Sequence, residues 1–573
     1  MVGHERLHHV VLNRRRFLLG SATAAAGAVL AACGGSGSAP TATASGTASS
    51  GVTTTGTTAA STAPSLSTTA KNPPQGKPQG NKPSELVIAW GVNQLAAHGI
   101  DPQTHVNTVA ESQLRHMYEP LVKIERDAKT ISPLLATAWA RLDDNTMQFK
   151  LRQGVTFHNG EGFDADSVKY SILRPLDPKN NADARTTYSV IDRVDVVDKY
   201  TVTVHTAKPD PVLLLRMTGF SMVQVAPKWT DANAVNGVMK DANGTGPYKL
   251  KSWSPQQDLV VEANEQYWGG APPIKNVRMK TITELSTRVA ALRSGEVQIA
   301  KDVPPEETDA INNGGRQTAP VEVSNRVPFY LMEVRKPPLD NLKLRQAVNY
   351  AVDWEAIIQG SLLGNGTRVS TVLPPWTVGY DPSLRPYPYD PDKAKSLMKE
   401  AGFPNGFDLN MYRFQGLYMK DKEIGEAIVQ QLNTAGIRAK DQLLDPGVFQ
   451  QKDAARELDG LMFTAWGNWI FDADNTFYPI FSTEARDTSN GGKGSSRRAY
   501  GNPEFNQLIT DARYTLDPQK RNDLYARAQK VFFDDAPCLF MYQLMDIYGV
   551  DNWVQWNPRH DEMVWAYEMK WNE

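Results

Sequence analysis

The stretch Thr146-Met-Gln-Phe-Lys-Leu-Arg-Gln-Gly-Val-Thr-Phe-His-Asn-Gly160 contains a clear strand pattern near the start of the folded part of this chain. Met147, Phe149 and Leu151 alternate with polar residues, so the apolar side chains would lie on one face of a strand. Gly154 then breaks the pattern. We therefore expect a half-buried strand that ends before this glycine.

The residues that follow predict a helix and a hairpin. Asp164 has the side chain of a helix cap and precedes the segment 165–173, which Pro175 would stop. Two further alternating stretches, 191–197 and 201–205, lie close enough together to form a hairpin. This part of the chain is expected to be a sheet with one short helix.

The second half of the chain has a different pattern, in which longer helices alternate with short apolar segments. Helix caps are expected at Asn341, Asp353 and Asp390. The segment 420–435 has apolar residues at helical spacing, and Gly436 is expected to end that helix. Helices that alternate with short strands favour an α/β lobe.

Length and composition limit the class of protein. The chain has 573 residues, 41% of them hydrophobic, a formal charge of −2 and two cysteines, Cys33 and Cys538. These values exclude a wholly disordered chain, a disulfide-rich miniprotein and a strongly basic nucleic-acid binder. A single core stops growing at roughly 250 to 300 residues, so at least two lobes are expected.

The N-terminal segment has the pattern of an export signal. Arg14, Arg15 and Arg16 precede an uncharged run, Phe17–Ala32, that is shorter than the ~20 residues a membrane-spanning helix needs. The motif around these arginines resembles a twin-arginine signal. Leu30-Ala-Ala-Cys33 resembles a bacterial lipobox, which implies removal of residues 1–32 and lipidation of Cys33.

A low-complexity segment separates the expected lipid anchor from the expected body. Of the 37 residues in 34–70, 33 are Ser, Thr, Ala or Gly, and several prolines follow before residue 84. Such a segment buries too little apolar surface to offset its ordering entropy. We expect 33–83 to be a disordered tether, and a glycosylated stalk is an open alternative.

Motifs for catalysis are scarce. Beyond residue 32 the sequence contains no P-loop, no His-Glu-x-x-His, no Cys-x-x-Cys and no Gly-x-Ser-x-Gly between a strand and a helix. His98, His105 and His116 could be proposed as metal ligands, but their spacing fits no tight metal motif and core or solvated histidines are preferred. We expect no catalytic residue, metal or cofactor.

Nine motifs follow one another along 84–573. They are Leu86-Val-Ile-Ala-Trp90 with Ile100-Asp-Pro102, Tyr118-Glu-Pro-Leu-Val122, Pro133-Leu-Leu-Ala-Thr-Ala-Trp139, Phe149–Gly160, Gly244-Thr-Gly-Pro-Tyr248, Asn264 with Tyr267-Trp268, Leu292-Arg-Ser-Gly-Glu296, Arg345–Asp353 and Asn502-Pro-Glu-Phe505. In this order they resemble the large peptide-type solute-binding proteins of ABC importers, known as family 5, and the likeness covers nearly all of 84–573.

The resemblance implies an α/β, two-lobed periplasmic-binding-protein fold of class II, the large type with an extra inserted domain and a hinge between the lobes. On that pattern, lobe one would hold 84–284 with 536–573, including the inserted sheet subdomain, and lobe two would hold 285–535. The chain would cross between the lobes twice, as a hinge requires.

The resemblance also implies a cleft segment around Trp466. In the family a Trp is followed three residues later by an Asp that pairs with a peptide amine, and Trp469 stands at that position here. Trp466, Asn468, Trp469 and Asp472 are therefore candidate ligand-binding residues. Core packing for Trp469, and a cap or turn for Asp472 and the nearby Asp474, are the alternatives.

Two candidates come from lobe one. Gln94 and His98 follow the apolar run Glu85–Trp90, which predicts a buried strand, and a solvated loop is the alternative for both. Together these features predict a monomeric, extracytoplasmic lipoprotein that captures a peptide or another medium-sized polar solute for an ABC permease and its ATPase. An oligosaccharide is the rival ligand, made more credible by Trp469, and an extracytoplasmic hydrolase or a sensor is a distant alternative. A nucleic-acid partner is not expected.

Overall fold

The computed structural model describes residues 72–92, 95, 99–180, 182, 185–234, 239–255, 257–483 and 500–573. The expected signal, Cys33 and most of the expected tether lie outside these residues. Residues 72–83 have no regular secondary structure. They contact the body, because Gln75 Nε2 donates to Val554 O and Gln79 Nε2 donates to Gly315 O. The expected tether therefore ends earlier than residue 83.

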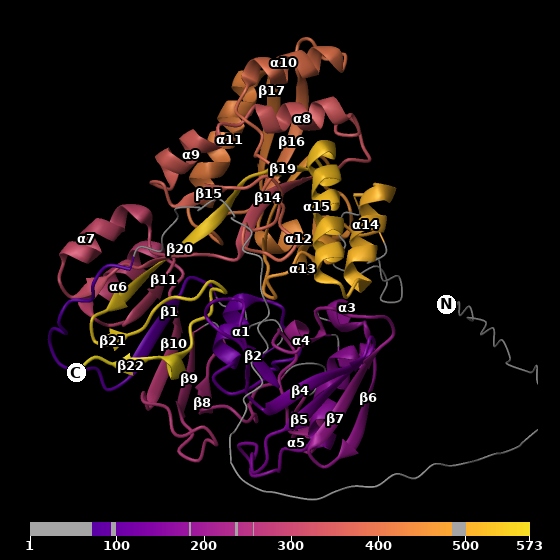
Figure 1. Ribbon diagram of the computed structural model, residues 1–573. Coiled ribbons are helices and arrows are strands. Elements are labelled where there is room, and N and C mark those ends of the chain that lie inside the picture. The colour runs from indigo at the N-terminus through magenta and orange to yellow at the C-terminus, as the bar shows by residue number, and fades with distance from the viewer. Residues whose placement is uncertain are drawn as a thin grey trace, which may run out of the picture. The chain divides into compact units, whose positions relative to one another are not determined.

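A nine-stranded mixed sheet contains the first and last strands of the body, in the order β12-β20-β11-β1-β10-β9-β8, with β13 and β15 also paired to β20 (Figure 1). Strand β1 is parallel to both neighbours and almost wholly buried, which fits its continuous apolar run. The bounds are β1 Leu86–Trp90, β8 Tyr248–Trp253, β9 Asp258–Ala263, β10 Asn276–Thr281, β11 Ile299–Lys301, β12 Gln317–Thr318, β13 Val321–Val323, β15 Gly366–Arg368 and β20 Tyr542–Asp551.

A four-stranded antiparallel sheet, in the order β4-β5-β7-β6, lies beside this large sheet. Its strands are β4 Ala136–Asp143, β5 Thr146–Leu151, β6 Ile191–Asp198 and β7 Thr201–Thr206, and helix α2 Ala165–Leu173 packs on it. The expected strand, hairpin and helix are confirmed. Asp164 and Ser167 form a reciprocal capping box at the start of α2. We call these two sheets the first lobe, apart from β15, which pairs with the first residues of β20.

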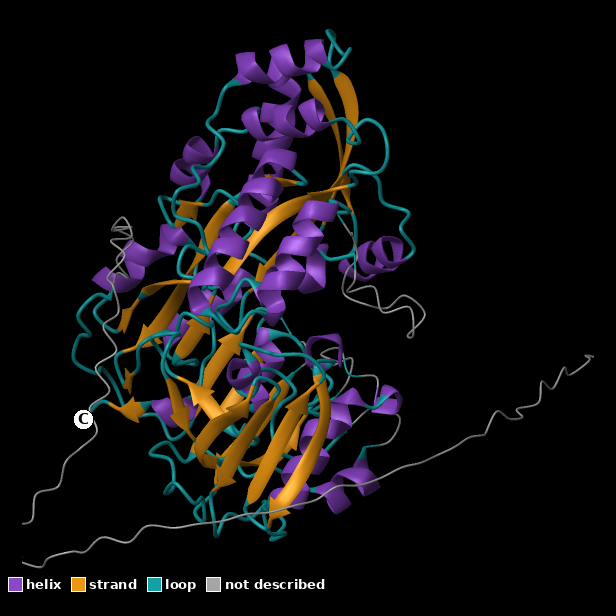
Figure 2. Cartoon of the chain, turned by 45° about the vertical axis from the view of Figure 1, so that its right-hand side comes forward, coloured by secondary structure: helices purple, strands orange, loops and turns teal. Residues whose placement is uncertain are grey.

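The second lobe is built on a five-stranded sheet, in the order β17-β16-β18-β14-β19. Helices are concentrated around it (Figure 2). The strands are β14 Arg326–Met332, β16 Phe407–Arg413, β17 Ile437–Leu443, β18 Leu461–Gly467 and β19 Cys538–Phe540. The helices are α8 Leu342–Tyr350, α9 Trp354–Ser361, α10 Pro391–Glu400, α11 Asp421–Ala435, α13 Asp474–Phe481, α14 Pro503–Tyr514 and α15 Pro518–Asp535.

Local signals fix the ends of these helices. Asn341, Asp353 and Asp390 each accept a hydrogen bond from a backbone N–H in the first turn of the helix they cap, as expected. Gly436 ends α11 in a left-handed conformation with φ +94°, which suits glycine. The sequence-based expectations for α8, α9, α10 and α11 are confirmed within about two residues.

Shorter elements complete the described residues. In the first lobe they are α1 Thr108–Leu114, β2 Val122–Ile124, β3 Ile131–Pro133, α3 Arg185–Tyr188, α4 Leu213–Arg216, α5 Pro227–Asn233, α6 Leu285–Ser294, α7 Thr308–Asn313, β21 Val554–Gln555 and β22 Lys570–Trp571. In the second lobe the remaining helix is α12 Pro446–Ala454.

The sheets correct the expected lobe boundaries. Strands β11, β12 and β13 lie beyond Leu285 but belong to the nine-stranded sheet of the first lobe. The chain enters the five-stranded sheet at Arg326 and leaves it after β19, which pairs with β14. The boundaries expected at Leu285 and Ala536 are therefore wrong. Strands β11 to β13 pair with β20 near the C-terminus, and local patterns do not reveal such distant pairing.

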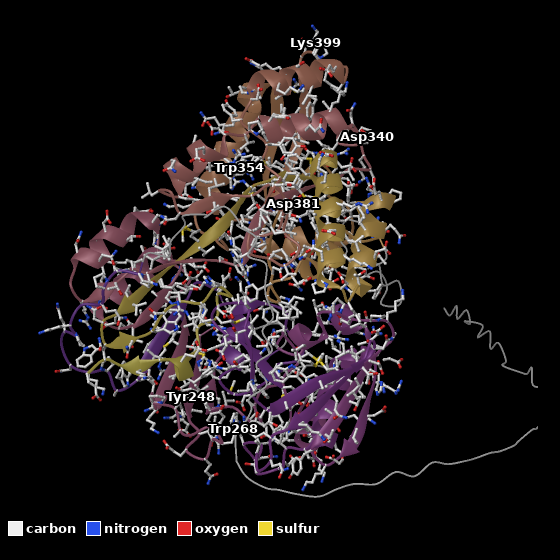
Figure 3. The ribbon with its side chains drawn as sticks, viewed as in Figure 1. Tyr248, Trp268, Asp340, Trp354, Asp381 and Lys399 are labelled. Atoms are coloured by element: carbon white, nitrogen blue, oxygen red, sulfur yellow. The ribbon has the colours of Figure 1, made fainter. Side chains whose placement is uncertain are left out.

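Each lobe has its own apolar core. Trp354 is buried in the second-lobe core, whereas Tyr248 is buried among the strands of the first (Figure 3). Cys538 is fully buried on β19, as expected for a small core residue. Among the described residues, every helix is too short or too polar to cross a membrane.

Candidate functional site

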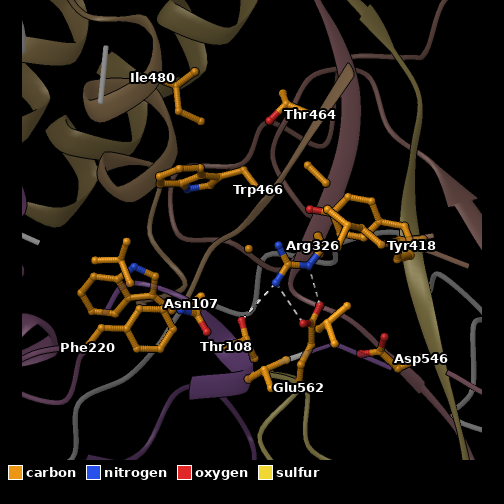
Figure 4. A pocket seen from close by; sticks show the side chains of 18 of the residues that line it. Asn107, Thr108, Phe220, Arg326, Tyr418, Thr464, Trp466, Ile480, Asp546 and Glu562 are labelled. Carbon is orange, nitrogen blue, oxygen red and sulfur yellow. Dashed lines mark hydrogen bonds and ion pairs between the residues drawn. The ribbon is translucent and has the colours of Figure 1, made fainter. Parts of the chain in front are cut away.

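A cavity of about 720 Å³ lies between the two lobes and is lined by both. That volume falls in the range of pockets that bury small organic ligands. Its first-lobe lining includes Trp90, Asn107, Thr108, Phe220, Lys301, Asp302, Asp546 and Glu562. Its second-lobe lining includes Arg326, Tyr418, Thr464, Trp466, Trp469 and Ile480 (Figure 4).

Aromatic rings form one side of this cavity. The indole of Trp466, at the end of β18, is held by a hydrogen bond of 2.8 Å from Nε1 to Asn475 O. Trp469 stacks on Phe220 of the first lobe, with 5.1 Å between ring centroids and 25° between ring planes. It therefore packs across the lobe interface and also lines the cavity. The structure brings these two predicted residues together at the cavity wall.

Two other predicted residues of this segment do not reach the cavity. Asn468 is buried, where its Nδ2 donates to Asp472 O and to Thr476 Oγ1, and its Oδ1 accepts from Asp472 N. The Asp472 carboxylate is buried against Arg521, with two N–O distances of 2.6 Å. Asn468 and Asp472 are thus structural, because internal partners occupy their polar groups. Gln94 and His98 lie outside the described residues.

A charged network forms the opposite side of the cavity, and sequence reasoning missed it. Arg326 Nε and Nη2 each donate to Glu562 at 3.0 Å, and Nη2 also reaches Thr108 Oγ1 at 3.0 Å. Lys301 Nζ lies 3.3 Å from Glu562. Burial alone would raise the pKa of Glu562, but Arg326 and Lys301 outweigh it and hold that pKa well below its usual range. This carboxylate is therefore ionised and already paired with Arg326 and Lys301.

The sequence carried a signal for these residues. Lys301 ends the short apolar strand β11, and Asp546 is an acidic residue inside the apolar run of β20. A charged side chain within a buried strand is costly unless it has a partner or a task. A search for charges inside apolar runs would have found both.

A second buried network joins the lobes beside the cavity. Arg216, at the end of α4, donates to Asp210 at 2.8 Å and to Asp474 of α13 at 2.5 Å. Asp474 also accepts from Arg513 of α14 at 2.8 Å. In Figure 1, α3 and α4 of the first lobe face α13 of the second. The network places Asp474 between two guanidinium groups, one from each lobe.

The geometry suits binding of a solute. No group of His, Cys, Asp and Glu side chains that could hold a metal is found in the part of the chain that the structure describes. His105 Nε2 contacts Gly99 O at 2.9 Å, and His116 Nε2 accepts from Ala566 N at 3.0 Å. Both rings are buried, which confirms the core interpretation for these two histidines.

Known proteins with related sequences identify the family. The family model described as bacterial extracellular solute-binding proteins, family 5 Middle, matches residues 130–488. The chain belongs to this family. The glutathione-binding protein GsiB of Salmonella paratyphi A is 28% identical over 468 residues, which are 79% of this chain and 88% of the relative. The GsiB of Pectobacterium atrosepticum is 27% identical over 471 residues, with 80% and 88% covered.

Solved structures of other solute-binding proteins have the same fold. The periplasmic binding protein DppA of Helicobacter pylori, in complex with the peptide STSA, matches with a TM-score of 0.75 and 23% identity over 85% of this chain and 98% of that one. The dipeptide-binding protein of Pseudoalteromonas sp. SM9913, in complex with Met-Leu, has a TM-score of 0.76 and 22% identity over 85% and 100%. The two-lobed α/β periplasmic-binding-protein fold predicted from the sequence is confirmed.

Proposed function

We propose that this protein captures a peptide or a peptide-like solute between its lobes and delivers it to the permease of an ABC importer. The observation that carries the proposal is the cavity of about 720 Å³, which is lined by residues of both lobes. It lies in a chain that belongs to family 5 of the solute-binding proteins. A solute that contacts both lobes stabilises the closed form by its differential affinity for that form. Glutathione and dipeptides are the solutes named for the relatives.

The proposed role is capture and not catalysis. The described cavity residues form ion pairs and apolar contacts, and the sequence beyond residue 32 contains none of the nucleophile or metal motifs considered above. Energy for transport would come from the ATPase of the importer. The protein would act outside the cytoplasm as a monomer, held at the membrane by a lipid on Cys33.

An oligosaccharide is the second candidate ligand. Trp90, Trp466 and Trp469 all line the cavity, and flat indole faces suit the apolar faces of sugar rings. One face of Trp469 already stacks on Phe220, which leaves less of this ring for a sugar. The charged network around Glu562 favours a charged solute, so the peptide-like ligand is the main proposal.

A thermal-shift panel on the full chain tests the proposal. A mixed library of di- to pentapeptides is compared with reduced glutathione and with cello- and xylo-oligosaccharides. A solute at 100 times its Kd adds ~2.7 kcal/mol to the free energy of unfolding and raises the melting temperature. We expect the peptide library or glutathione to raise it. A shift with oligosaccharides alone would mean that the ligand is an oligosaccharide and not a peptide. Release of product from any peptide would contradict the capture role.

A further inference from the structure

We propose that Asp546, on the strand that returns from the second lobe to the first, binds a cationic group of the captured solute, either an ammonium or a guanidinium. The inference rests on the proposed function and adds the charge that the solute must carry at one end.

The backbone fixes where the Asp546 carboxylate lies. All ten residues of β20 are buried, and this strand pairs with β15 at one end and with β13, β11 and β12 farther along. Asp546 stands opposite Glu322 of β13. It is 7% exposed and lines the cavity, on the opposite side from Phe220 (Figure 4). A rigid, paired strand thus presents a carboxylate to the cavity.

This carboxylate lacks a full set of partners. Within the described residues, Asp546 Oδ2 is buried and accepts no hydrogen bond. The nearby cations are engaged elsewhere, since Lys301 and Arg326 both pair with Glu562. An unsatisfied buried acceptor costs about 1–3 kcal/mol, and more when it is charged. A donor from the solute would remove that cost, so the unpaired oxygen favours a cationic ligand over a neutral one.

The charges around Asp546 are also unbalanced. The lining as a whole also contains Arg185, but the charged residues that act most strongly on Asp546 are two cations, Lys301 and Arg326, and two carboxylates, Asp302 and Glu562, which makes five charged groups with Asp546 itself. One negative charge remains when all five are ionised. A single positive charge on the solute neutralises it, whereas a solute carboxylate placed here would be repelled.

The rest of the cavity indicates how such a solute would lie. Trp466 and Phe220 lie across the cavity from Asp546, and Thr464 and Ile480 line the part near Trp466 (Figure 4). A solute with its cation at Asp546 would extend its uncharged body toward these rings. A peptide with a free amino terminus has this arrangement of charge and apolar surface.

Burial makes the proposed contact sensitive to pH. It raises the pKa of Asp546 to about 8, an effect opposed by Lys301 and reinforced by Glu562. The other charged groups that face or flank this side chain are Asp302, Glu322 and Arg326. A cationic solute binds the ionised carboxylate, so below pH 8 its binding releases a proton. Affinity therefore rises with pH, by at most tenfold per pH unit.

The test compares a peptide library with the same library after N-acetylation, using the full chain and Asp546→Asn. The wild type is expected to bind the free-amine library at least tenfold more tightly, by apparent Kd from melting curves. Between pH 5.5 and 7.0 that affinity should rise by up to about 30-fold. Asp546→Asn should lose both the preference and the pH dependence. Asp408→Asn removes an exposed carboxylate that pairs with Arg438 and Lys440, and should keep both.

The outcomes separate this inference from the proposed function. Equal binding of the two libraries by the wild type, or an unchanged preference in Asp546→Asn, overturns the role of Asp546 and leaves peptide capture standing. The pH measurement on the wild type needs no variant, so misfolding of Asp546→Asn does not prevent a decision. If neither library binds, hexylamine and 1-hexanol are compared. Selective, Asp546-dependent binding of hexylamine supports the inference alone, and its absence overturns both.

Discussion

Trp469 joins the two lobes through a single side chain. Its ring stacks on Phe220 and lies over Gly219, where a Cβ atom would lie 1.8 Å from Cζ3 of the indole. The absence of a side chain at residue 219 therefore creates the space into which the indole fits. Because the same ring lines the cavity, this side chain contributes both to the packing between the lobes and to the shape of the binding site.

Two substitutions test this contact. Trp469→Ala removes the ring and is expected to weaken peptide binding by up to about tenfold, since aromatic pairs contribute about 0.5–1.5 kcal/mol beyond the area they bury. Gly219→Ala keeps the ring but forces it to move, so we expect weaker binding and a changed tryptophan fluorescence spectrum. Binding is measured by thermal titration with the peptide library.

Gly162→Ala is the matched control for this pair. A Cβ atom at Gly162 would meet nothing within 4 Å, so this substitution should leave binding and fluorescence unchanged. Wild-type affinity in both Trp469→Ala and Gly219→Ala would show that the contact serves neither closure nor solute binding.

At the scale of the elements, local patterns predicted much of the fold and distant pairing limited the rest. Capping side chains such as Asp164 and Asp390 act within one helical turn, so sequence alone located their helices. The lobe boundary at Leu285 failed because the short strands β11 to β13 are recognised only by their pairing with β20. Pairing over such a sequence separation leaves no local signature.

The candidate site shows the same division. Trp466 and Trp469 were predicted from a motif and do line the cavity. Asn468 and Asp472 belong to the same motif, but their polar groups are used within the segment and by Arg521. Asp546 was missed because its position depends on a strand that runs from one lobe to the other. Spacing along the sequence does not show which side chains of a segment line a cavity.

The ion network between α4, α13 and α14 gives a prediction for these elements. Asp474→Asn leaves the buried guanidiniums of Arg216 and Arg513 without their shared carboxylate. Breaking a buried pair in this way costs about 3–5 kcal/mol. We expect that loss in denaturant unfolding, and a larger radius of gyration in solution scattering without solute, because Arg216 belongs to the other lobe.

The surface control Asp408→Asn should cost less than about 1 kcal/mol, because Asp408 and both its partners are largely exposed. A radius of gyration equal to that of the wild type in Asp474→Asn would mean that the network stabilises α13 and α14 without holding the lobes together.

The same carboxylate predicts an acid response. Burial alone would raise the pKa of Asp474, but Arg513 and Arg216 outweigh it and lower that pKa to about 2. The resulting stabilisation is fully present above the ordinary Asp value near 4 and is lost as the pH falls from 4 to 2. It amounts to about 2 kcal/mol. In urea unfolding, the free energy of unfolding of the wild type should fall between pH 4 and pH 2. In Asp474→Asn this fall should be smaller, because residue 474 no longer titrates.

At the scale of the whole molecule, we expect the chain to divide into an N-terminal export signal, a tether and a binding body. The described body contributes both walls of the cavity, and β20 carries the chain back from one lobe to the other beside Asp546. The lipid expected on Cys33 would keep this body near its permease while the tether lets it move. Location and binding are therefore expected to be separable, since they depend on different parts of the chain.

Cys33→Ser tests that separation. Each buried CH₂ of an attached lipid contributes ~0.8 kcal/mol of membrane affinity, so the wild type should sediment with membranes and dissolve in detergent. The variant should appear in the extracytoplasmic soluble fraction with unchanged affinity for the peptide library. Cys538→Ser is the matched control, because this thiol is buried in β19 and carries no expected lipid. The Cys538→Ser protein should therefore remain on the membrane. If Cys33→Ser still sedimented, the body or the tether would itself bind the membrane, and location would not depend on the lipid.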